Sequence, residues 1–101
     1  MYPESYTHLI AGSIPRDTWQ EAWYSISTWK GYLQSFPGFL RLRVSIRELE
    51  GGDIRVAIAT IWEHEEQLDA WLGGQWRADR ILQQLSTPAY DVTDEILADL
   101  S

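Results

Sequence analysis

The apolar residues of this chain follow two different periods, and each change of period marks a new element. Residues 6–14 are rich in β-branched and aromatic side chains, which is typical of a strand, and Pro15 ends this segment. After it, apolar side chains recur every three or four residues, which predicts one amphipathic helix of about 18 residues. Its apolar stripe comprises Trp19, Ala22, Trp23, Ile26, Trp29, Leu33 and Phe36.

Both ends of this helix carry sequence signals. Thr18 and Glu21 fit a capping box, in which each side chain satisfies a free amide of the first turn. Asp17 is an equally good N-cap, so two starts one residue apart stay open. Pro37 disfavours the helical conformation for the residue before it, and the helix is therefore expected to stop there.

Residues 40–47 and 54–62 alternate with a period of two, which predicts two strands. One face of the first strand carries Leu40, Leu42, Val44 and Ile46, and the other carries Arg41, Arg43, Ser45 and Arg47. A two-residue Gly51-Gly52 turn would mix the apolar and polar sets of the two strands. A three-residue loop over residues 51–53 pairs Ile46 with Ile58 and keeps the sets together. The same loop pairs Val44 with Thr60, so we expect a hairpin with an odd loop and a glycine bulge.

The second half of the chain predicts one more helix, a continuation and a last strand. Acids in Glu63-His64-Glu65-Glu66 favour the positive end of a helix dipole, and Leu68, Trp71 and Leu72 form the buried side of that helix. Gly73-Gly74 interrupts it, and an apolar pattern restarts over residues 76–85. Residues 90–97 are expected to form a fourth strand, with a short helix as the alternative. The order β-α-β-β-α-β predicts a ferredoxin-like α+β fold, an antiparallel sheet with helices on one face, as a single domain over residues 1–101.

Composition narrows the classes of partner and chemistry. The 101 residues carry a net charge of −7, which repels phosphate backbones and argues against nucleic acid as a partner. The chain contains no cysteine, so disulfides and thiolate catalysis are excluded. Since no apolar run approaches the ~20 residues of a membrane span, and no signal peptide precedes the first strand, we expect a cytoplasmic protein without a membrane partner.

A helix followed by Pro37-Gly38-Phe39, a hairpin, Thr60-Ile61-Trp62-Glu63 and a second helix bearing Trp71 resembles the antibiotic biosynthesis monooxygenase family. That family is a branch of the dimeric α+β barrels, and the resemblance covers roughly residues 6–85. It implies a ferredoxin-like subunit whose sheet packs against the sheet of a second copy and closes a barrel around a two-fold axis.

The sheet face that points away from the helices is expected to be half apolar. Phe39 is expected to share this face with the arginines of the hairpin. Such faces on small sheets usually meet a partner. With the family resemblance, this predicts a homodimer through the face that carries Arg41, Arg43, Ala57, Ala59 and Ile61.

Four of the seven arginines lie in the hairpin: Arg41, Arg43, Arg47 and Arg55. In one interpretation they lay their methylenes on the sheet and pair with Glu48, Glu50 or the acids of a partner. In the other they form an anion-binding patch. The acidity of the chain favours the first interpretation.

The resemblance implies a ligand cavity between the sheet and the helices of each subunit, and tryptophans are expected to line it. They are Trp19, Trp23, Trp62, Trp71 and Trp76. Flat indole rings suit a planar aromatic ligand, with the indole N–H as a polar group. Plain core packing is the alternative, and the helical spacing of Trp19, Trp23 and Trp29 favours it for these three. Trp71 matches a position at which quinone-forming and haem-degrading members carry a functional tryptophan, so the resemblance implies a catalytic role for it.

The known chemistries of the family fit this chain only in part. Quinone-forming members oxidise phenols or anthrones with O2 and neither metal nor flavin, which implies no cofactor here. They use an asparagine on the first strand, and this chain contains no asparagine. Haem-degrading members ligate iron with a histidine ten residues after the helical tryptophan, a position that Ile81 occupies. Haem degradation is therefore disfavoured.

His8 is the candidate replacement, because it lies on the first strand near the missing asparagine. A neutral imidazole is a suitable base near pH 7. If the even-numbered residues of this strand face the helices, His8 and Ile10 share a cavity wall with Trp62. The alternative is a surface or edge histidine.

The other histidine, His64, stands among Glu63, Glu65 and Glu66. No HExxH or similar spacing is present, so the segment is interpreted as a solvated helix start and not as a metal site.

Two functions follow from these residues. The first is a cofactor-independent oxygenase that acts on a planar phenolic or polyketide-like compound, with Trp62 and Trp71 binding it and His8 as base. The second is a non-catalytic dimeric α+β barrel that binds a small ligand or has a structural or stress role.

Overall fold

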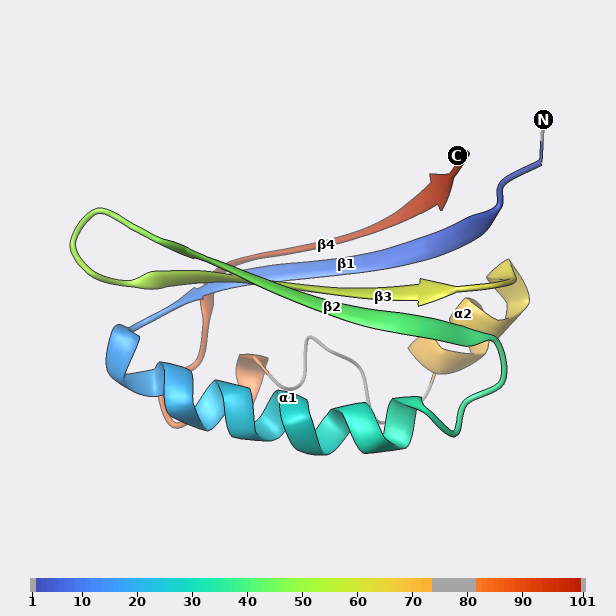
Figure 1. Cartoon of the computed structure of the whole chain (residues 1–101). Coiled ribbons are helices and arrows are strands. Elements are labelled where there is room, and N and C mark those ends of the chain that lie inside the picture. The colour runs from blue at the N-terminus through green and yellow to red at the C-terminus, as the bar shows by residue number, and fades with distance from the viewer. Residues whose placement is uncertain (1, 74–81, 101) are drawn as a thin grey trace.

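The computed structural model describes residues 2–73 and 82–100 of the chain (Figure 1). Its elements follow the predicted β-α-β-β-α-β order, so the ferredoxin-like α+β fold is confirmed. In chain order they are β1 (Ser5–Ile14), a 3-10 turn η1 (Arg16–Thr18), α1 (Trp19–Leu33), β2 (Phe39–Glu48), β3 (Ile54–Trp62), α2 (Glu65–Leu72) and β4 (Tyr90–Asp99).

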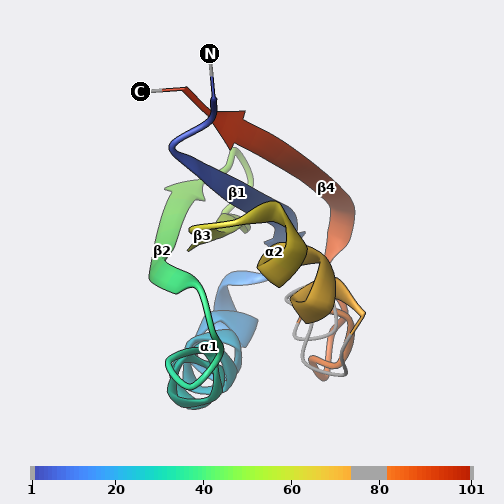
Figure 2. The same ribbon diagram turned by 90° about the vertical axis from the view of Figure 1, so that its right-hand side faces the viewer.

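The four strands form one antiparallel sheet in the order β2-β3-β1-β4. Both helices cover the same face of this sheet, and the opposite face is left bare (Figures 1 and 2). We call these the inner face and the outer face. The N-terminal strand β1 is central, and the termini lie near each other at one end of the sheet.

The inner face holds the core because every second residue of the central strands is apolar. Ile10, Ile14, Val56 and Ile58 are fully buried there. The helices contribute a second apolar layer that packs against these strand residues. It comprises Ala22, Ile26, Trp29 and Leu33 from α1 and Leu68 and Trp71 from α2.

The hairpin has the predicted faces but not the predicted register. Ile46 pairs with Val56, two residues from the expected Ile58, and Val44 pairs with Ile58 instead of Thr60. Residues 49–53 connect the strands, and Leu49 N–H donates to Asp53 O at 2.8 Å. Gly51 and Gly52 take φ angles of 94° and 97°, which only glycine adopts readily. The loop is longer than predicted. A shift of two residues leaves every side chain on its original face, so the apolar pattern cannot distinguish the two registers.

A second difference concerns the start of β2. The register shifts between Phe39 and Arg41, as in a β-bulge, and Phe39 pairs with Trp62. Phe39 therefore packs on the core, with its ring centroid 5.6 Å from that of Trp62, and the expectation that it lies on the outer face is wrong. Leu40 is the extra residue, and it is exposed instead of lying among the inner-face residues.

The first helix starts without the predicted capping box. Thr18 has helical backbone angles and its hydroxyl makes no capping hydrogen bond. The 3-10 turn that precedes α1 supplies the start instead, with Thr18 N–H donating to Pro15 O at 3.0 Å. The helix spans 15 residues, ending before the Pro37 region as expected.

The second helix begins at Glu65, two residues later than expected, and ends at Leu72 beside Gly73. Residues 74–81, including Trp76, lie outside the described residues. No helix within residues 2–73 and 82–100 is long and apolar enough to cross a membrane.

Candidate functional site

His8 lies on the inner face of β1 and is 1% exposed, which confirms that the even-numbered residues of this strand face the helices. Its Nε2 atom lies 2.7 Å from Oδ1 of Asp94 on the neighbouring edge strand β4. The carboxylate side chain of Asp94 is 40% exposed. The pair therefore joins a buried imidazole to an acid that water reaches, and the surface alternative for His8 does not hold.

The other ring nitrogen of His8 is buried and has no hydrogen-bond partner among the described residues. A carboxylate accepts hydrogen bonds, so the contact with Asp94 favours the tautomer that carries its proton on Nε2. Nδ1 then holds an unshared lone pair inside the protein. This nitrogen is chemically a base and an acceptor that is already oriented by its partner.

An aromatic cluster packs around Trp62 at the end of β3, next to the start of β1. The Trp71 ring lies 5.7 Å from Trp62, 5.4 Å from Trp29 and 4.8 Å from Phe36, measured between centroids. The Trp62 Nε1–H donates to Thr60 Oγ1 at 3.0 Å, and Thr60 is the register partner of His8. His8 is thus linked to the cluster through Thr60.

Trp71 is fully buried, yet its Nε1–H has no partner among the described residues. Buried polar groups are nearly always hydrogen-bonded, so each exception calls for an explanation. Within this described part of the chain, one buried donor on α2 and one buried acceptor on β1 are both unused. The His8 nitrogen is suited to accept a hydrogen bond from a hydroxyl, and the Trp71 N–H is suited to donate one to a carbonyl or anionic oxygen.

The remaining predicted tryptophans lie elsewhere. Trp19 and Trp23 contact each other at 5.7 Å, and no ring contact in the described parts of the chain joins them to Trp62 or Trp71. Trp23 is 49% exposed and lines a groove of about 400 Å³ between α1 and β2. The other residues of this groove are Ile26, Ser27, Lys30, Leu42 and Val44. The structure therefore separates the predicted tryptophans: Trp62 and Trp71 lie in the buried cluster, Trp23 lines the groove, and Trp19 is partly buried against the core.

His64 lies at the exposed start of α2, with Nε2 3.8 Å from Glu63 Oε1. Within residues 2–73 and 82–100, no three histidine, cysteine, aspartate or glutamate side chains gather as a metal site would need.

Sequence reasoning missed Asp94 and Thr60 as site residues. The signal for Asp94 was present, because residues 92, 94 and 96 share a face of β4 and only the middle one is charged. A lone acid on an apolar face implies a buried polar partner. Thr60 carried no comparable signal, since threonine is common in strands.

The outer face carries the predicted arginines together with small and apolar residues. Arg41 pairs with Ile61 and Arg43 with Ala59, while Ala57 pairs with Ala11 in the centre of the sheet. Acids occupy the opposite edge, where Glu95 pairs with Leu9 and Asp99 with Ser5 on the same face. This face is therefore basic along β2, apolar in the middle and acidic along β4.

No protein-family profile matches the chain, and no curated protein matches it in sequence. Solved structures do match. An antibiotic biosynthesis monooxygenase from Bacillus cereus superimposes with a TM-score of 0.71 at 19% identity, over 97% of this chain and 95% of that one. The chain shares the fold of the antibiotic biosynthesis monooxygenases. The resemblance predicted from the sequence is confirmed at this level.

Two other similar structures differ in chemistry. SnoaB, a cofactor-independent oxygenase from Streptomyces nogalater, has a TM-score of 0.72 at 14% identity, with 97% of this chain and 95% of that one covered. MhuD, a haem degrader from Mycobacterium tuberculosis with two haems in its active site, has a TM-score of 0.69 at 20% identity, with 95% and 96% covered. A dimeric protein of ferredoxin-like fold from Bacteroides fragilis is also among the matches, which supports self-association for this fold.

Proposed function

We propose that the protein is a cofactor-independent oxygenase that oxidises a planar phenolic or anthrone-type compound at the inner face of its sheet. The observation that carries the proposal is the buried His8, whose Nε2 is held by Asp94 at 2.7 Å while Nδ1 stays without a partner among the described residues. A base fixed by a carboxylate and shielded from water is what removal of a proton from such a compound needs.

Each described residue of the site has a separate task in this proposal. His8 Nδ1 accepts the substrate proton, and the Trp71 Nε1–H donates to the oxygen on which negative charge develops. Trp62 and Trp71 supply flat surfaces for the ring system. The resulting anion is electron-rich and reduces O2 directly.

The atoms and electrons of this reaction balance without a further reductant. At a methylene carbon of the substrate, two C–H bonds break and one C=O bond forms, which oxidises the carbon by four electrons. One oxygen atom of O2 enters the new carbonyl, and the other leaves as water with the two hydrogens. The four electrons that the carbon gives up are those that reduce O2.

Oxygen uptake with anthrone as substrate tests this proposal. His8→Gln keeps a polar side chain but removes the base, and we expect turnover to fall by about 10²–10⁴-fold. His64→Gln is the matched control, because the second histidine is exposed and remote from the cluster. Equal turnover in both variants would contradict the role of His8.

The same assay separates the alternatives. Quenching of tryptophan fluorescence by anthrone without oxygen uptake would indicate the non-catalytic ligand-binding barrel. Haem together with ascorbate as the reductant serves as the second substrate, with ascorbate alone as the blank, since one similar structure is a haem degrader. Oxygen uptake with haem and none with anthrone would overturn the proposed substrate class.

We further propose that the protein is a homodimer through its outer face. Arginines line the β2 edge and acids line the β4 edge of the same face, with small and apolar residues between them. A two-fold axis that lies between two such faces and runs parallel to the strands would set the basic edge of one copy against the acidic edge of the other.

Charge reversal tests the interface. Arg43→Glu should weaken the dimer because like charges then meet across the interface. Adding Glu95→Arg to the same chain should restore association, which analytical ultracentrifugation measures. Glu66→Arg on the exposed side of α2 is the control and should leave the dimer unchanged. A wild-type monomer would exclude this interface.

A further inference from the structure

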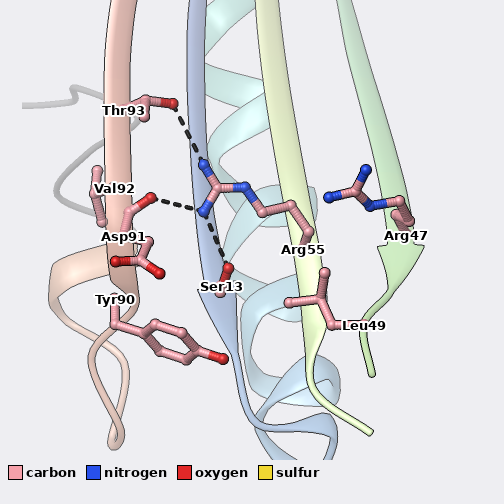
Figure 3. Close-up of a pocket in the computed structure, with 8 residues that line it drawn as sticks. All are labelled: Ser13, Arg47, Leu49, Arg55, Tyr90, Asp91, Val92 and Thr93. Atoms are coloured by element: carbon pink, nitrogen blue, oxygen red, sulfur yellow. Dashed lines mark hydrogen bonds between the residues drawn. The ribbon is translucent and has the colours of Figure 1, made fainter. Parts of the chain in front are cut away.

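A second candidate site lies on the outer face, at the end of the sheet near the hairpin loop (Figure 3). It is an open cleft of about 680 Å³ between β2, β3 and β4. Its lining residues are Ser13, Arg47, Leu49, Arg55, Tyr90, Asp91, Val92 and Thr93. None of them belongs to the His8 site, which is on the other face.

Arg55 is the cation of this cleft that makes three hydrogen bonds with described residues. Its Nη1 donates to Ser13 Oγ at 3.0 Å and to the main-chain oxygen of Asp91 at 2.6 Å, and Nη2 donates to Thr93 Oγ1 at 3.5 Å. The side chain thus reaches from β3 across β1 to β4, as Figure 3 shows. All three acceptors are uncharged, so the positive charge is positioned but not neutralised.

These three bonds leave two of the five guanidinium N–H groups without a partner among the described residues, those of Nε and one of Nη2. A guanidinium presents such groups as a fork that matches the oxygens of a carboxylate or phosphate.

Arg47 brings a second positive charge to the same cleft. It is the direct register partner of Arg55, and Figure 3 shows its side chain extending from β2 toward it. Like charges directly opposite one another destabilise a sheet. Neither arginine has a carboxylate within 4.0 Å in the described parts of the chain. Glu48 pairs with Arg16 instead, and the Asp91 carboxylate forms no ion pair with a described residue. A bound anion would remove this repulsion.

We propose that this cleft binds a small organic phosphate, with its oxygens between Arg47 and Arg55 and its organic part against Leu49 and Tyr90. The two guanidinium groups supply the charge, and Ser13 and Thr93 hold Arg55 in place. The Asp91 carboxylate lies in the same cleft and repels negative charge. A ligand is therefore expected to bind with its phosphate next to the arginines and away from Asp91.

Titration with inorganic phosphate and then phenyl phosphate, followed by ¹H–¹⁵N NMR at constant ionic strength, tests the proposal. We expect phenyl phosphate to bind more tightly than inorganic phosphate, and both to shift the side-chain N–H signals of the two arginines. Arg55→Lys keeps the charge but removes the fork, and Arg47→Gln removes a charge; each should weaken binding at least about tenfold.

Lys30→Gln is the matched control, since it removes one exposed positive charge of α1 outside the lining of the cleft. Equal weakening by Arg47→Gln and Lys30→Gln, with no effect of the charge-conserving Arg55→Lys, would mean that phosphate responds only to overall charge, which overturns the site. If phosphate does not bind the wild-type protein and Arg47→Gln weakens self-association instead, the cleft holds a carboxylate of a second copy and the proposal is wrong. Neither result depends on oxygenase activity, so this test and that of the proposed function fail independently.

Discussion

The two faces of the sheet are built from the same strands but differ in almost every physical property. On the inner face, Trp62 and His8 are buried beneath the helices, where Trp71 of α2 packs against Trp62. On the outer face, Arg41, Arg43, Arg47 and Glu95 are exposed on either side of a strip of small and apolar residues. Because side chains alternate along a strand, one segment such as β1 serves both surfaces at once. The inner face is therefore sensitive to volume and to unpaired polar atoms, whereas the outer face is sensitive to charge.

The largest expected difference between the faces concerns packing. Trp71→Ala removes a fully buried ring that touches three other aromatic rings, and should cost about 3–5 kcal/mol of the free energy of unfolding. Trp23→Ala removes the same atoms from a half-exposed site and should cost about 1 kcal/mol or less. Urea denaturation of both variants measures the difference, and similar values would refute the assignment of Trp71 to the core.

A smaller effect is expected for the buried polar pair. Asp94→Asn replaces the charged acceptor of His8 and should destabilise the protein by about 1–3 kcal/mol. It should also change the tautomer of His8, which ¹⁵N NMR of the imidazole detects. Glu95→Gln changes the neighbouring residue on the outer face and should alter stability by about 0.5 kcal/mol or less.

On the outer face, the next expected effect is a change in the pKa of Tyr90 and not a loss of packing. The hydrogen bond that Tyr90 donates to Asp53 at 2.6 Å raises the pKa of the phenol above 10.0, chiefly because the carboxylate favours the protonated hydroxyl. The folded pKa exceeds the unfolded one, so this contribution to stability is present below pH 10 and is lost as the pH rises through the folded value. Tyrosinate absorbance should show a late titration of Tyr90 in the wild type, and Asp53→Asn should remove this delay.

The smallest expected effect lies at the rim of the helix layer. The hydroxyl and the backbone amide of Ser86 both donate hydrogen bonds to the Glu21 carboxylate. They lower the pKa of this carboxyl below 4.5, and the hydroxyl has the larger effect. The contribution is therefore present above pH 4.5 and is lost as the pH falls through the folded value. Ser86→Ala should move this pKa part of the way back, which NMR titration of the Glu21 carboxyl measures. An unchanged pKa would mean that the amide alone holds the carboxylate.

Residue patterns predicted the strands, the helices and their order, because two periods are easily distinguished in segments of this length. They did not fix the hairpin register, since shifts of two residues preserve the faces of Val44 and Ile46. Nor did they reveal the bulge at Leu40, which reverses the side of Phe39 while leaving the apolar count unchanged. Local geometry of this kind depends on hydrogen bonds that periodicity does not report.

The candidate site was predicted less completely than the fold. His8 was named because strand alternation places it on the inner face, and its burial confirms that placement. Its partner Asp94 is 86 residues away in the sequence, so only the pairing of β1 with β4 brings the two together. The tryptophans show what local spacing cannot predict. Both Trp71 and Trp23 lie on helices at apolar positions, yet Trp71 is buried and Trp23 is half-exposed.

The central position of β1 has a consequence for biosynthesis. This strand leaves the ribosome before both of its neighbours, since β3 follows about 40 residues later and β4 comes last of all. Until residues 90–99 emerge, one edge of β1 has no strand to pair with, although the hairpin and both helices are already available. Unpaired edges recruit other chains, so the nascent protein is exposed to aggregation for longest at the strand that carries His8. Slow translation of residues 90–99 would lengthen that interval.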